Sequence, residues 1–552
     1  MRALICFLLT LTTAALRAEP VGVNLAAIRD WSTAWPFVDA FKTARAWISH
    51  PTDGSTWDDG RPIDTTPEGW VASLLPGQNA GTLLFRDTGP GYPAGQYLCL
   101  YEGTGQLEIR FDAAVVSSTP GRLVLDVTPS EAGIHLVITQ TDPADPIRNI
   151  RVIMPGFEDT YETQIFHPEF LESLEPFAVL RFMDWMDTNN SYVSAWDERA
   201  KLTDASWALG RGVPVEIMAE LCNRLDADAW FCMPHLADDD FVARFAQLAE
   251  ATLDPDRRVY IEHSNEVWNG IFTQSQHAQQ QAAARGIPGA PFQAGLRYHA
   301  ERSVEIFDIF DDVFPPGRLV RVLAGQHANP WTGLQIMDWQ NAADHADAYA
   351  TAPYFGGSLG ASANAPSMSV AEMLEACRTD LIAQRDFTAD NLANAEARGL
   401  ELIAYEGGQH LAVLGANSGN QQVIDRFIEA NRDPFMRQLY RIDLEGWRRA
   451  GGGLFCSFSH ITRPGRYGSW GMLEHQTQPR ETAPKWLAVT DHIAGVSCPA
   501  DFNIDARVDF ADVTAFLIAF AAADPLADLV PDATLDFSDI QAFIVGFLGG
   551  CD

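Results

Sequence analysis

The chain has 552 residues, of which 47% are hydrophobic and 20% charged, and its formal net charge is −35. This length predicts one large domain with one or two small ones. The strong negative charge excludes a nucleic-acid partner, which needs a basic surface, but suits a neutral polymer or a cation as ligand.

The N-terminus has the pattern of an export signal. Arg2 supplies a positive charge, residues 3–15 are mostly apolar, and Ala18 is a small residue at the expected cleavage point. Residues 1–18 are therefore predicted to be a signal peptide, and the protein is expected to be secreted or attached to the cell surface. The apolar run is too short to span a membrane, and no other segment of the sequence predicts a membrane span.

After the leader, residues 21–25 predict a short strand, and a helical pattern follows through Phe37, Phe41 and Trp47. From 60 to 155 apolar and polar residues alternate in short runs that are separated by Gly, Pro and Asp. This alternation is typical of antiparallel strands joined by turns. We expect a small β-sandwich over 60–155.

From about 160 to 495 strand and helix patterns alternate. Seven strands here and the strand at 21–25 make eight, which predicts a (β/α)₈ barrel, an α/β fold also called a TIM barrel. The catalytic domain is then expected to span 19–495, with the sandwich inserted between its first two strands. The seven strands are predicted at 177–182, 229–235, 258–266, 318–325, 348–355, 401–408 and 452–460, with a closing helix at 484–493.

The last segment, 498–552, contains a repeat. Residues 509–517 (DFADVTAFL) match 536–544 (DFSDIQAFI) at an offset of 27, since 536 − 509 = 27. Acidic residues precede each copy at the spacing of a calcium-binding loop, which places oxygen ligands at positions 1, 3, 5, 7, 9 and 12. Cys498 and Cys551 bracket the segment and are expected to form a disulfide.

Two such loops, each followed by a short apolar helix, resemble a dockerin module, a small all-α domain similar to EF-hands. The resemblance implies Ca²⁺ binding and a cohesin-type protein partner. Ala506 and Ala533 replace the usual turn glycine, and Val530 removes one ligand of the second loop; an acidic helical tail without metal is the alternative. The side-chain ligands would be Asp501, Asn503, Asp505, Asp509 and Asp512 in the first loop, and Asp528, Asp532, Asp536 and Asp539 in the second.

Two glutamates end predicted barrel strands: Glu266 ends the fourth and Glu406 ends the seventh. A barrel carries its reactive groups at the carboxyl ends of its strands. Hydrolysis of a glycosidic bond needs two carboxyl groups that flank that bond. Glu262 competes within the fourth strand, but Glu266 is preferred because it follows Asn265 and lies closer to the strand end.

The run from Glu262 to Glu266 (EHSNE) resembles the E-x-x-N-E signature of the clan A glycoside hydrolases, whose second catalytic glutamate ends strand seven. The resemblance covers the barrel and not the sandwich. It implies that Glu266 is the acid/base and Glu406 the nucleophile of a retaining reaction without a cofactor. It also implies that the two carboxyl groups lie about 5 to 5.5 Å apart.

The same resemblance implies roles for residues around the pair. Asn265 would hold the sugar 2-hydroxyl, Arg181 would keep Glu406 ionised, and Tyr354 would donate a hydrogen bond to Glu406. His235, which ends strand three, is predicted to bind the substrate, and Trp470 follows strand eight, where relatives often carry a sugar-stacking aromatic. The expected substrate is a plant or algal β-glycan cleaved internally, because modular secreted enzymes usually attack polymers; that step is analogy.

Two other functions compete with this interpretation. A non-catalytic carbohydrate-binding protein would have Glu266 and Glu406 far apart or in separate ion pairs. A carbohydrate esterase would use Ser358, which lies in a G-x-S-x-G match at 356–360. That motif requires a helix directly after the turn, whereas Pro366 and no helical periodicity follow here.

Overall fold

The computed structural model describes residues 20–496, 498–530 and 534–549. The predicted signal peptide and the residues Asp532, Ala533 and Cys551 lie outside these ranges. Cys498 is disulfide-bonded, as its predicted pairing requires. The helices in the described ranges include none that is both long enough and apolar enough to cross a membrane.

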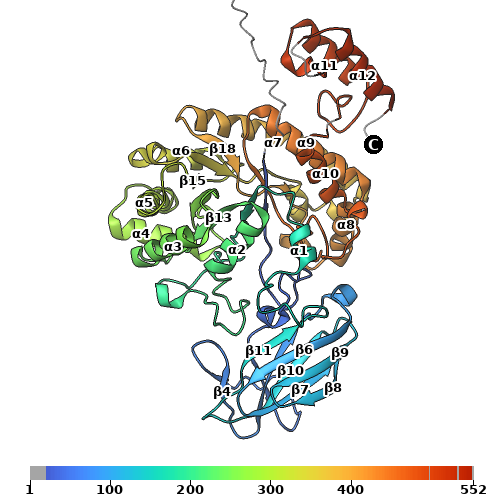
Figure 1. Ribbon diagram of the computed structural model, residues 1–552. Helices are drawn as coiled ribbons and strands as arrows, with labels where there is room; N and C mark the ends of the chain where they lie inside the picture. Colours follow the sequence, from blue (N-terminus) through green and yellow to red (C-terminus); the bar gives the residue numbers. More distant parts are fainter. Residues whose placement is uncertain (1–19, 497, 531–533, 550–552) are drawn as a thin grey trace, which may run out of the picture.

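Eight parallel strands close into a barrel, which confirms the predicted barrel fold (Figure 1). The first strand pairs with both the second and the eighth, so the ring is complete. In order around the barrel the strands are β1 (Val21–Asn24), β12 (Val179–Arg181), β13 (Asp228–Met233), β14 (Val259–His263), β15 (Leu319–Ala324), β16 (Ala348–Thr351), β18 (Glu401–Ala404) and β20 (Phe455–Ser457).

Amphipathic helices pack around the barrel. In α9 the side chains of Met436, Leu439 and Tyr440 are buried at spacings of three and four residues, which places them on one face. Asp433 caps the start of this helix, and Gly451, with φ of 98°, ends it in the left-handed conformation. The helices are α1 (Pro168–Glu172), α2 (Val215–Leu225), α3 (Asp239–Thr252), α4 (Thr273–Arg285), α5 (Pro291–Asp311), α6 (Pro330–Met337), α7 (Val370–Glu396), α8 (Gln421–Arg432), α9 (Pro434–Ala450) and α10 (Pro484–Ile493).

Several strands are shorter than predicted at their carboxyl ends, so Glu266 and Glu406 follow their strands instead of ending them. β14 stops at His263 because Ser264 and Glu266 adopt φ of 62° and 43°, which no strand accommodates. β18 stops at Ala404, and a separate two-residue strand, β19 (Gly408–Gln409), pairs with β17 (Tyr354–Phe355). Glu266 and Glu406 therefore lie in the loops that follow their barrel strands.

Two four-stranded antiparallel sheets lie between β1 and β12 in the sequence, and side chains from both fill one hydrophobic core. The first sheet begins with β2 and therefore starts before residue 60. Its order is β2 (Ile48–Pro51), β5 (Gln78–Leu84), β10 (Ile134–Thr141) and β7 (Gly105–Phe111). The second has the order β11 (Arg148–Ile153), β6 (Gly95–Glu102), β9 (Arg122–Val127) and β8 (Ala113–Thr119).

The helix predicted through Phe37, Phe41 and Trp47 is wrong. Only a short 3₁₀ turn, η1 (Ala40–Thr43), forms there. Phe37 belongs to the barrel core and Phe41 to the core of the sheets. A segment whose apolar side chains enter two separate cores cannot present them on one helical face.

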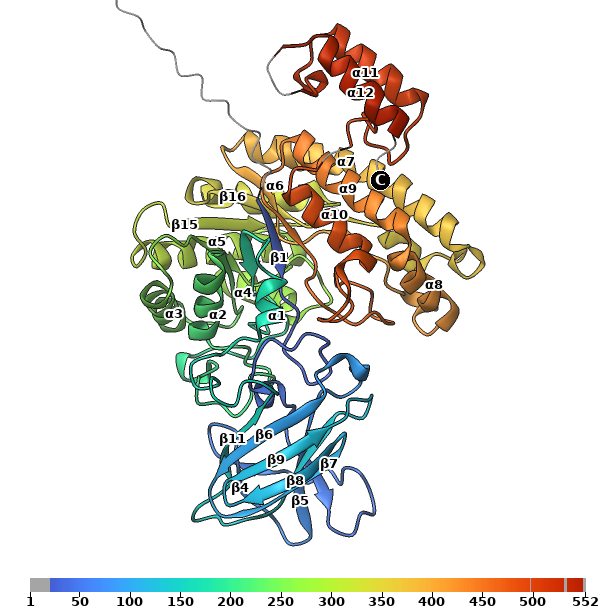
Figure 2. The ribbon, with the colours of Figure 1, turned by 45° about the vertical axis from the view of Figure 1, so that its right-hand side comes forward.

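The C-terminal repeat folds as two helices, α11 (Phe510–Ala521) and α12 (Phe537–Gly549). The N–H groups of Asn503 and Val530, 27 residues apart, donate to Asp512 and Asp539, also 27 residues apart. The two loops are thus built alike. Figures 1 and 2 show the barrel between the two sheets and this helical pair.

Candidate active site

Glu266 and Glu406 lie at the carboxyl end of the barrel, three residues after β14 and two after β18. Glu406 is buried, whereas Glu266 is partly exposed. The left-handed backbone of Glu266 is uncommon for a residue with a side chain and costs about 1–3 kcal/mol. Such strain clusters at functional sites, and here it turns the Glu266 side chain out of the strand.

Arg181 ends β12 and organises the site from beneath. One terminal nitrogen donates to Glu406 at 2.8 Å and to Asn24 at 2.9 Å. The other donates to Glu262 at 2.9 Å and to Asn265 at 2.8 Å. Since the guanidinium is fully buried and permanently charged, it supplies a fixed positive charge beside two carboxylates.

Glu406 receives two strong donors. Besides Arg181, the hydroxyl of Tyr354 donates to it at 2.9 Å. Burial raises the pKa of Glu406, while Arg181 and Tyr354 oppose that rise. Glu406 is therefore the better placed of the two glutamates to carry the negative charge of the pair.

Glu266 has a different environment. Asn269 donates to one of its oxygens at 2.8 Å and Tyr405 to the other at 3.3 Å, and no cation contacts it in the described chain. Burial, followed by the charge of Glu406, raises the pKa of Glu266 to about 7. The two carboxyl groups therefore differ in environment: a buried guanidinium and a phenol favour the ionised form of Glu406, whereas Glu266 has only an amide and a phenol as donors.

The competing candidate Glu262 lies below the pair and is completely buried. Its carboxylate accepts from Arg181 and, at 2.9 Å, from the indole of Trp230. Asn265 is likewise engaged: it accepts from Arg181 and donates to Asn189 at 3.1 Å. Glu262 cannot reach a substrate, so the preference for Glu266 agrees with the geometry.

The structure brings Trp470 to the pair but not His235. The Trp470 ring contacts Tyr354 at 5.8 Å between centroids, and Tyr354 bonds Glu406. His235 instead contacts His277 of α4 at 5.3 Å, and burial lowers its pKa to about 4. In the described residues His235 has no contact with either glutamate.

Three neighbours of the pair were missed from the sequence. Asn269 and Tyr405 bind Glu266, and Tyr405 directly precedes Glu406. Asp184 is close enough to Glu406 that burial, followed by the Glu406 charge, raises its pKa to about 7. Asp184 stands three residues beyond the end of β12, a position at which a barrel carboxylate should be considered.

Two further sequence predictions concern the esterase motif around Ser358 and the calcium-binding loops. Ser358 is exposed in a five-residue 3₁₀ turn, η5 (Gly357–Ala361), where the esterase motif needs an α-helix. Its hydroxyl has no hydrogen bond to a histidine within the described ranges. No three His, Cys, Asp or Glu side chains there are grouped closely enough to hold a metal ion, and calcium binding stays a prediction.

In the first C-terminal loop Asp501 pairs with Arg441 of α9 at 2.9 Å and accepts the N–H groups of Asp505 and Ala506. Ala506 adopts φ of 65°, the left-handed conformation for which glycine is usual. The loop keeps its turn despite the missing glycine, and it rests against the barrel through an arginine.

No protein-family model and no curated protein matches the chain. Among solved structures it is similar to a GH51 arabinofuranosidase from Xanthomonas axonopodis pv. citri (12% identity, 54% of this chain, 61% of that chain, TM-score 0.37). A rhamnosyl-glucuronidase from Fusarium oxysporum (12% identity, 58% of this chain, 63% of that chain, TM-score 0.34) is also similar. A fungal β-1,4-galactanase gives 10% identity, 59% of this chain, 92% of that chain and a TM-score of 0.31. The chain thus spans less than two thirds of the length of the first two of these proteins. Because the identities and TM-scores are low, the function must be inferred from the site itself.

Proposed function

We propose that the protein is a secreted, retaining β-glycoside hydrolase with Glu266 as acid/base and Glu406 as nucleophile. The observation that carries the proposal is the division of one site into two unlike carboxyl groups. Glu406 binds a buried guanidinium and a phenol. Burial and the charge of Glu406 raise the pKa of Glu266 to about 7. A glycosidase needs this difference between its two carboxyl groups.

In the first step the Glu406 carboxylate attacks the anomeric carbon while Glu266 gives its proton to the glycosidic oxygen. The carbon–oxygen bond to the leaving group breaks, and a glycosyl ester of Glu406 forms. In the second step Glu266, now a carboxylate, takes a proton from water, and the resulting hydroxide displaces Glu406. The product retains its configuration because the anomeric carbon is inverted twice.

Arg181 and Tyr354 have defined parts in these steps. Their donors hold one Glu406 oxygen each, which orients the carboxylate for attack and stabilises it again as a leaving group. Asn265, oriented by Arg181, is proposed to bind the sugar 2-hydroxyl, and Trp470 to stack on the ring. His235 lies among other contacts, and we assign it no step.

The substrate is proposed to be a plant or algal β-glycan, cut internally, and the two sheets are proposed to form an inserted β-sandwich. The C-terminal helical pair is proposed to be a dockerin-like, EF-hand-related module that binds Ca²⁺ and a cohesin-type partner. Asp and Asn oxygens suit Ca²⁺, and the repeated loop contacts to Asp512 and Asp539 support a common loop design.

The proposal is tested by measuring hydrolysis of a panel of polysaccharides and aryl β-glycosides. The wild type is compared with the variants Glu266→Ala and Glu406→Ala. Glu250→Gln on α3 is the matched control, because Glu250 is a partly exposed glutamate that pairs with Arg318 at 3.7 Å away from the site. We expect both alanine variants to lose at least about a thousandfold in kcat/KM and the control to lose nothing. Azide should restore Glu406→Ala and give a glycosyl azide of inverted configuration.

Full activity in either alanine variant would contradict the mechanism. Carbohydrate binding without hydrolysis in the wild type would instead support the non-catalytic alternative. The charge of Glu406 acts on Glu266, which supports the enzyme, since the non-catalytic alternative expects the two carboxyl groups to lie far apart.

A further inference from the structure

The segment between β20 and α10 carries Trp470 to the candidate site; we refer to residues 458–476 as the strand-eight loop. Trp470 packs edge-on against three rings: His410 at 4.9 Å, Phe458 at 5.5 Å and Tyr354 at 5.8 Å. Its indole nitrogen donates to the carbonyl of Tyr467 at 2.8 Å. One face of the site around Glu406 therefore depends on where this loop is held.

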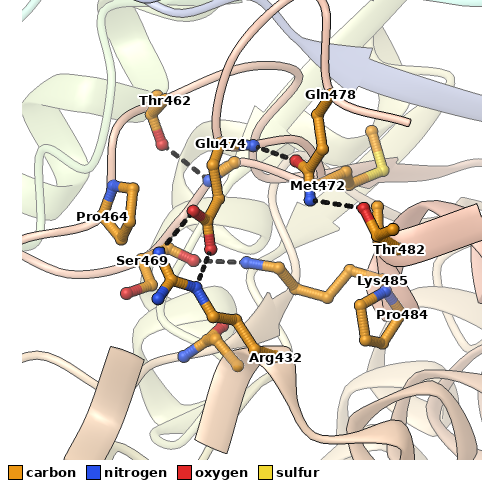
Figure 3. Close-up of a pocket in the computed structure, with 13 residues that line it drawn as sticks. Arg432, Thr462, Pro464, Ser469, Met472, Glu474, Gln478, Thr482, Pro484 and Lys485 are labelled. Atoms are coloured by element: carbon orange, nitrogen blue, oxygen red, sulfur yellow. Dashed lines mark hydrogen bonds and ion pairs between the residues drawn. The ribbon is translucent and has the colours of Figure 1, made fainter. Parts of the chain in front are cut away.

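One carbonyl group of the loop, that of Ser469, binds two side chains from elsewhere in the fold. Gln409 of β19 donates to it at 3.0 Å, and the ammonium of Lys485, on α10, donates to it as well. Figure 3 shows Lys485 extended toward Ser469 in a pocket that both residues line. Ser469 directly precedes Trp470, and Gln409 follows Glu406 by three residues, so the two donors tie the loop to the segment that holds the candidate nucleophile.

Lys485 is buried, with 4% of its surface exposed, and among the residues that the structure describes no carboxylate pairs with it. Glu474 of the strand-eight loop faces it, but both Glu474 oxygens are bound by Arg432 of α8 at 2.6 Å. From α9, Arg437 pairs with Asp491, six residues further along α10. Burial lowers the pKa of Lys485 to about 7, and the charge of Glu474 opposes this only in part.

A buried ammonium that binds a carbonyl and no carboxylate is a net cost to folding. An apolar side chain of the same length would fill the space more cheaply. Residues that break the rules of stable packing are expected where function requires them. The contact that Lys485 makes is with the loop that carries Trp470, and this contact is the candidate reason for its presence.

We propose that Lys485, together with Gln409, is a positioning residue that fixes the Ser469 carbonyl and thereby holds Trp470 against Tyr354 beside Glu406. Lys485 takes no part in proton transfer. In its absence the loop loses one of two donors to Ser469, and Trp470 leaves its place for part of the time. The proposal deepens the proposed function, on which it rests only for the statement that Trp470 binds a sugar.

The test variant is Lys485→Met, which keeps the length and apolar stem of the side chain and removes its donor. Hydrogen exchange at the peptides covering 463–476 should become at least about fivefold faster, with exchange in β14 and β18 unchanged. On aryl β-glycosides KM should rise about tenfold and kcat change less than about threefold, because the carboxyl pair is untouched. The melting temperature should not fall, since a buried charge has been removed.

The matched control is Lys42→Met. Lys42 is partly buried and donates to a backbone carbonyl, that of Asp204, at 2.7 Å, but it lies at η1 beside the sheets. This variant should leave loop exchange and KM unchanged. Lys485→Ala, tested with added ethylammonium ions, gives a second readout: the added amine should slow the exchange of the loop again.

Unchanged loop exchange in Lys485→Met would overturn the proposal, as would a fall in melting temperature with no change in KM. The exchange measurement needs no substrate. If the wild type has no glycosidase activity, the proposed function fails, while the exchange of residues 463–476 still decides whether Lys485 holds the loop.

Discussion

Two buried cations lie near the candidate site, and their effects on the fold are opposite. Arg181 binds two carboxylates and two amide oxygens within the barrel. Lys485 binds a single backbone carbonyl and faces the carboxylate of Glu474, which Arg432 already binds. The charge of Arg181 is balanced by the carboxylates beside it and sets the charge of the site. The charge of Lys485 has no such balance, and Lys485 only fixes the position of a loop.

The difference shows why burial alone does not tell what a charge does. A guanidinium with matched carboxylates has its desolvation offset by those partners, so removal of the cation leaves stranded anions. An ammonium with a carbonyl partner has little to offset its desolvation, so its removal relieves the fold. Arg181 should therefore be costly to remove and Lys485 should not.

The largest expected effect on stability is that of Arg181→Met. Glu262 and Glu406 would both lose their cation in the barrel interior, which predicts a destabilisation of about 3–5 kcal/mol. Activity should fall at least about a hundredfold even at temperatures where the variant is folded, because Glu406 would then share Glu266's tendency to hold a proton. Denaturant unfolding and kcat/KM measure the two effects; a stable, active variant would contradict the role of Arg181.

Glu266→Gln should act chiefly on activity, and its pH dependence is specific. Glu266 must be protonated for the first step, and its pKa is about 7. Wild-type kcat/KM should therefore fall as pH rises through about 7, by up to tenfold per pH unit. The variant should lose about 10²–10⁴ in rate on substrates with poor leaving groups and keep no such alkaline limb. An alkaline limb that persists in Glu266→Gln would assign the limb to another group.

Lys485→Met gives a smaller effect on stability, in the opposite direction to Arg181→Met. The pKa of Lys485 is about 7 in the fold and near 10.4 in the unfolded chain, so between these values the unfolded chain binds more protons. The free energy of unfolding should rise with pH across this window by at most about 1.4 kcal/mol per pH unit, and the cost is complete below pH 7. The variant should lack this slope, and an identical slope in wild type and variant would refute the assignment.

Calcium should have the smallest effect, because it acts outside the barrel. At a hundredfold excess over its Kd, Ca²⁺ should stabilise the C-terminal module by about 2.7 kcal/mol and leave glycosidase activity unchanged. Calorimetry with Ca²⁺ or EDTA, repeated on Asp505→Ala, measures the shift. If the wild type shows no shift, the calcium prediction is wrong.

Local patterns in the sequence were enough for the barrel and for the position of the two glutamates near its strand ends. The period of a strand or a helix depends on neighbours along the chain, so eight strand patterns predicted the closed ring, and the position of Glu266 and Glu406 near strand ends predicted that they meet. The closing helix at 484–493 was predictable for the same reason. The strand ends were not predictable from the sequence, because the left-handed backbone conformation of Glu266 is imposed by the site and not by the intrinsic preference of glutamate.

Only the tertiary structure decided which side chains surround the pair. Asn269 and Tyr405 bind Glu266 from the segments that follow β14 and β18, and Asp184 approaches Glu406 from the segment that follows β12. The anchor of the strand-eight loop joins Gln409, Ser469 and Lys485 across 60 and 16 residues of sequence. No local pattern encodes such contacts, because they depend on the three-dimensional closure of the barrel. The sequence by itself determined where two carboxyl groups would stand; the closed barrel decided which donors surround each of them, a buried guanidinium and a phenol at Glu406 and an amide and a phenol at Glu266.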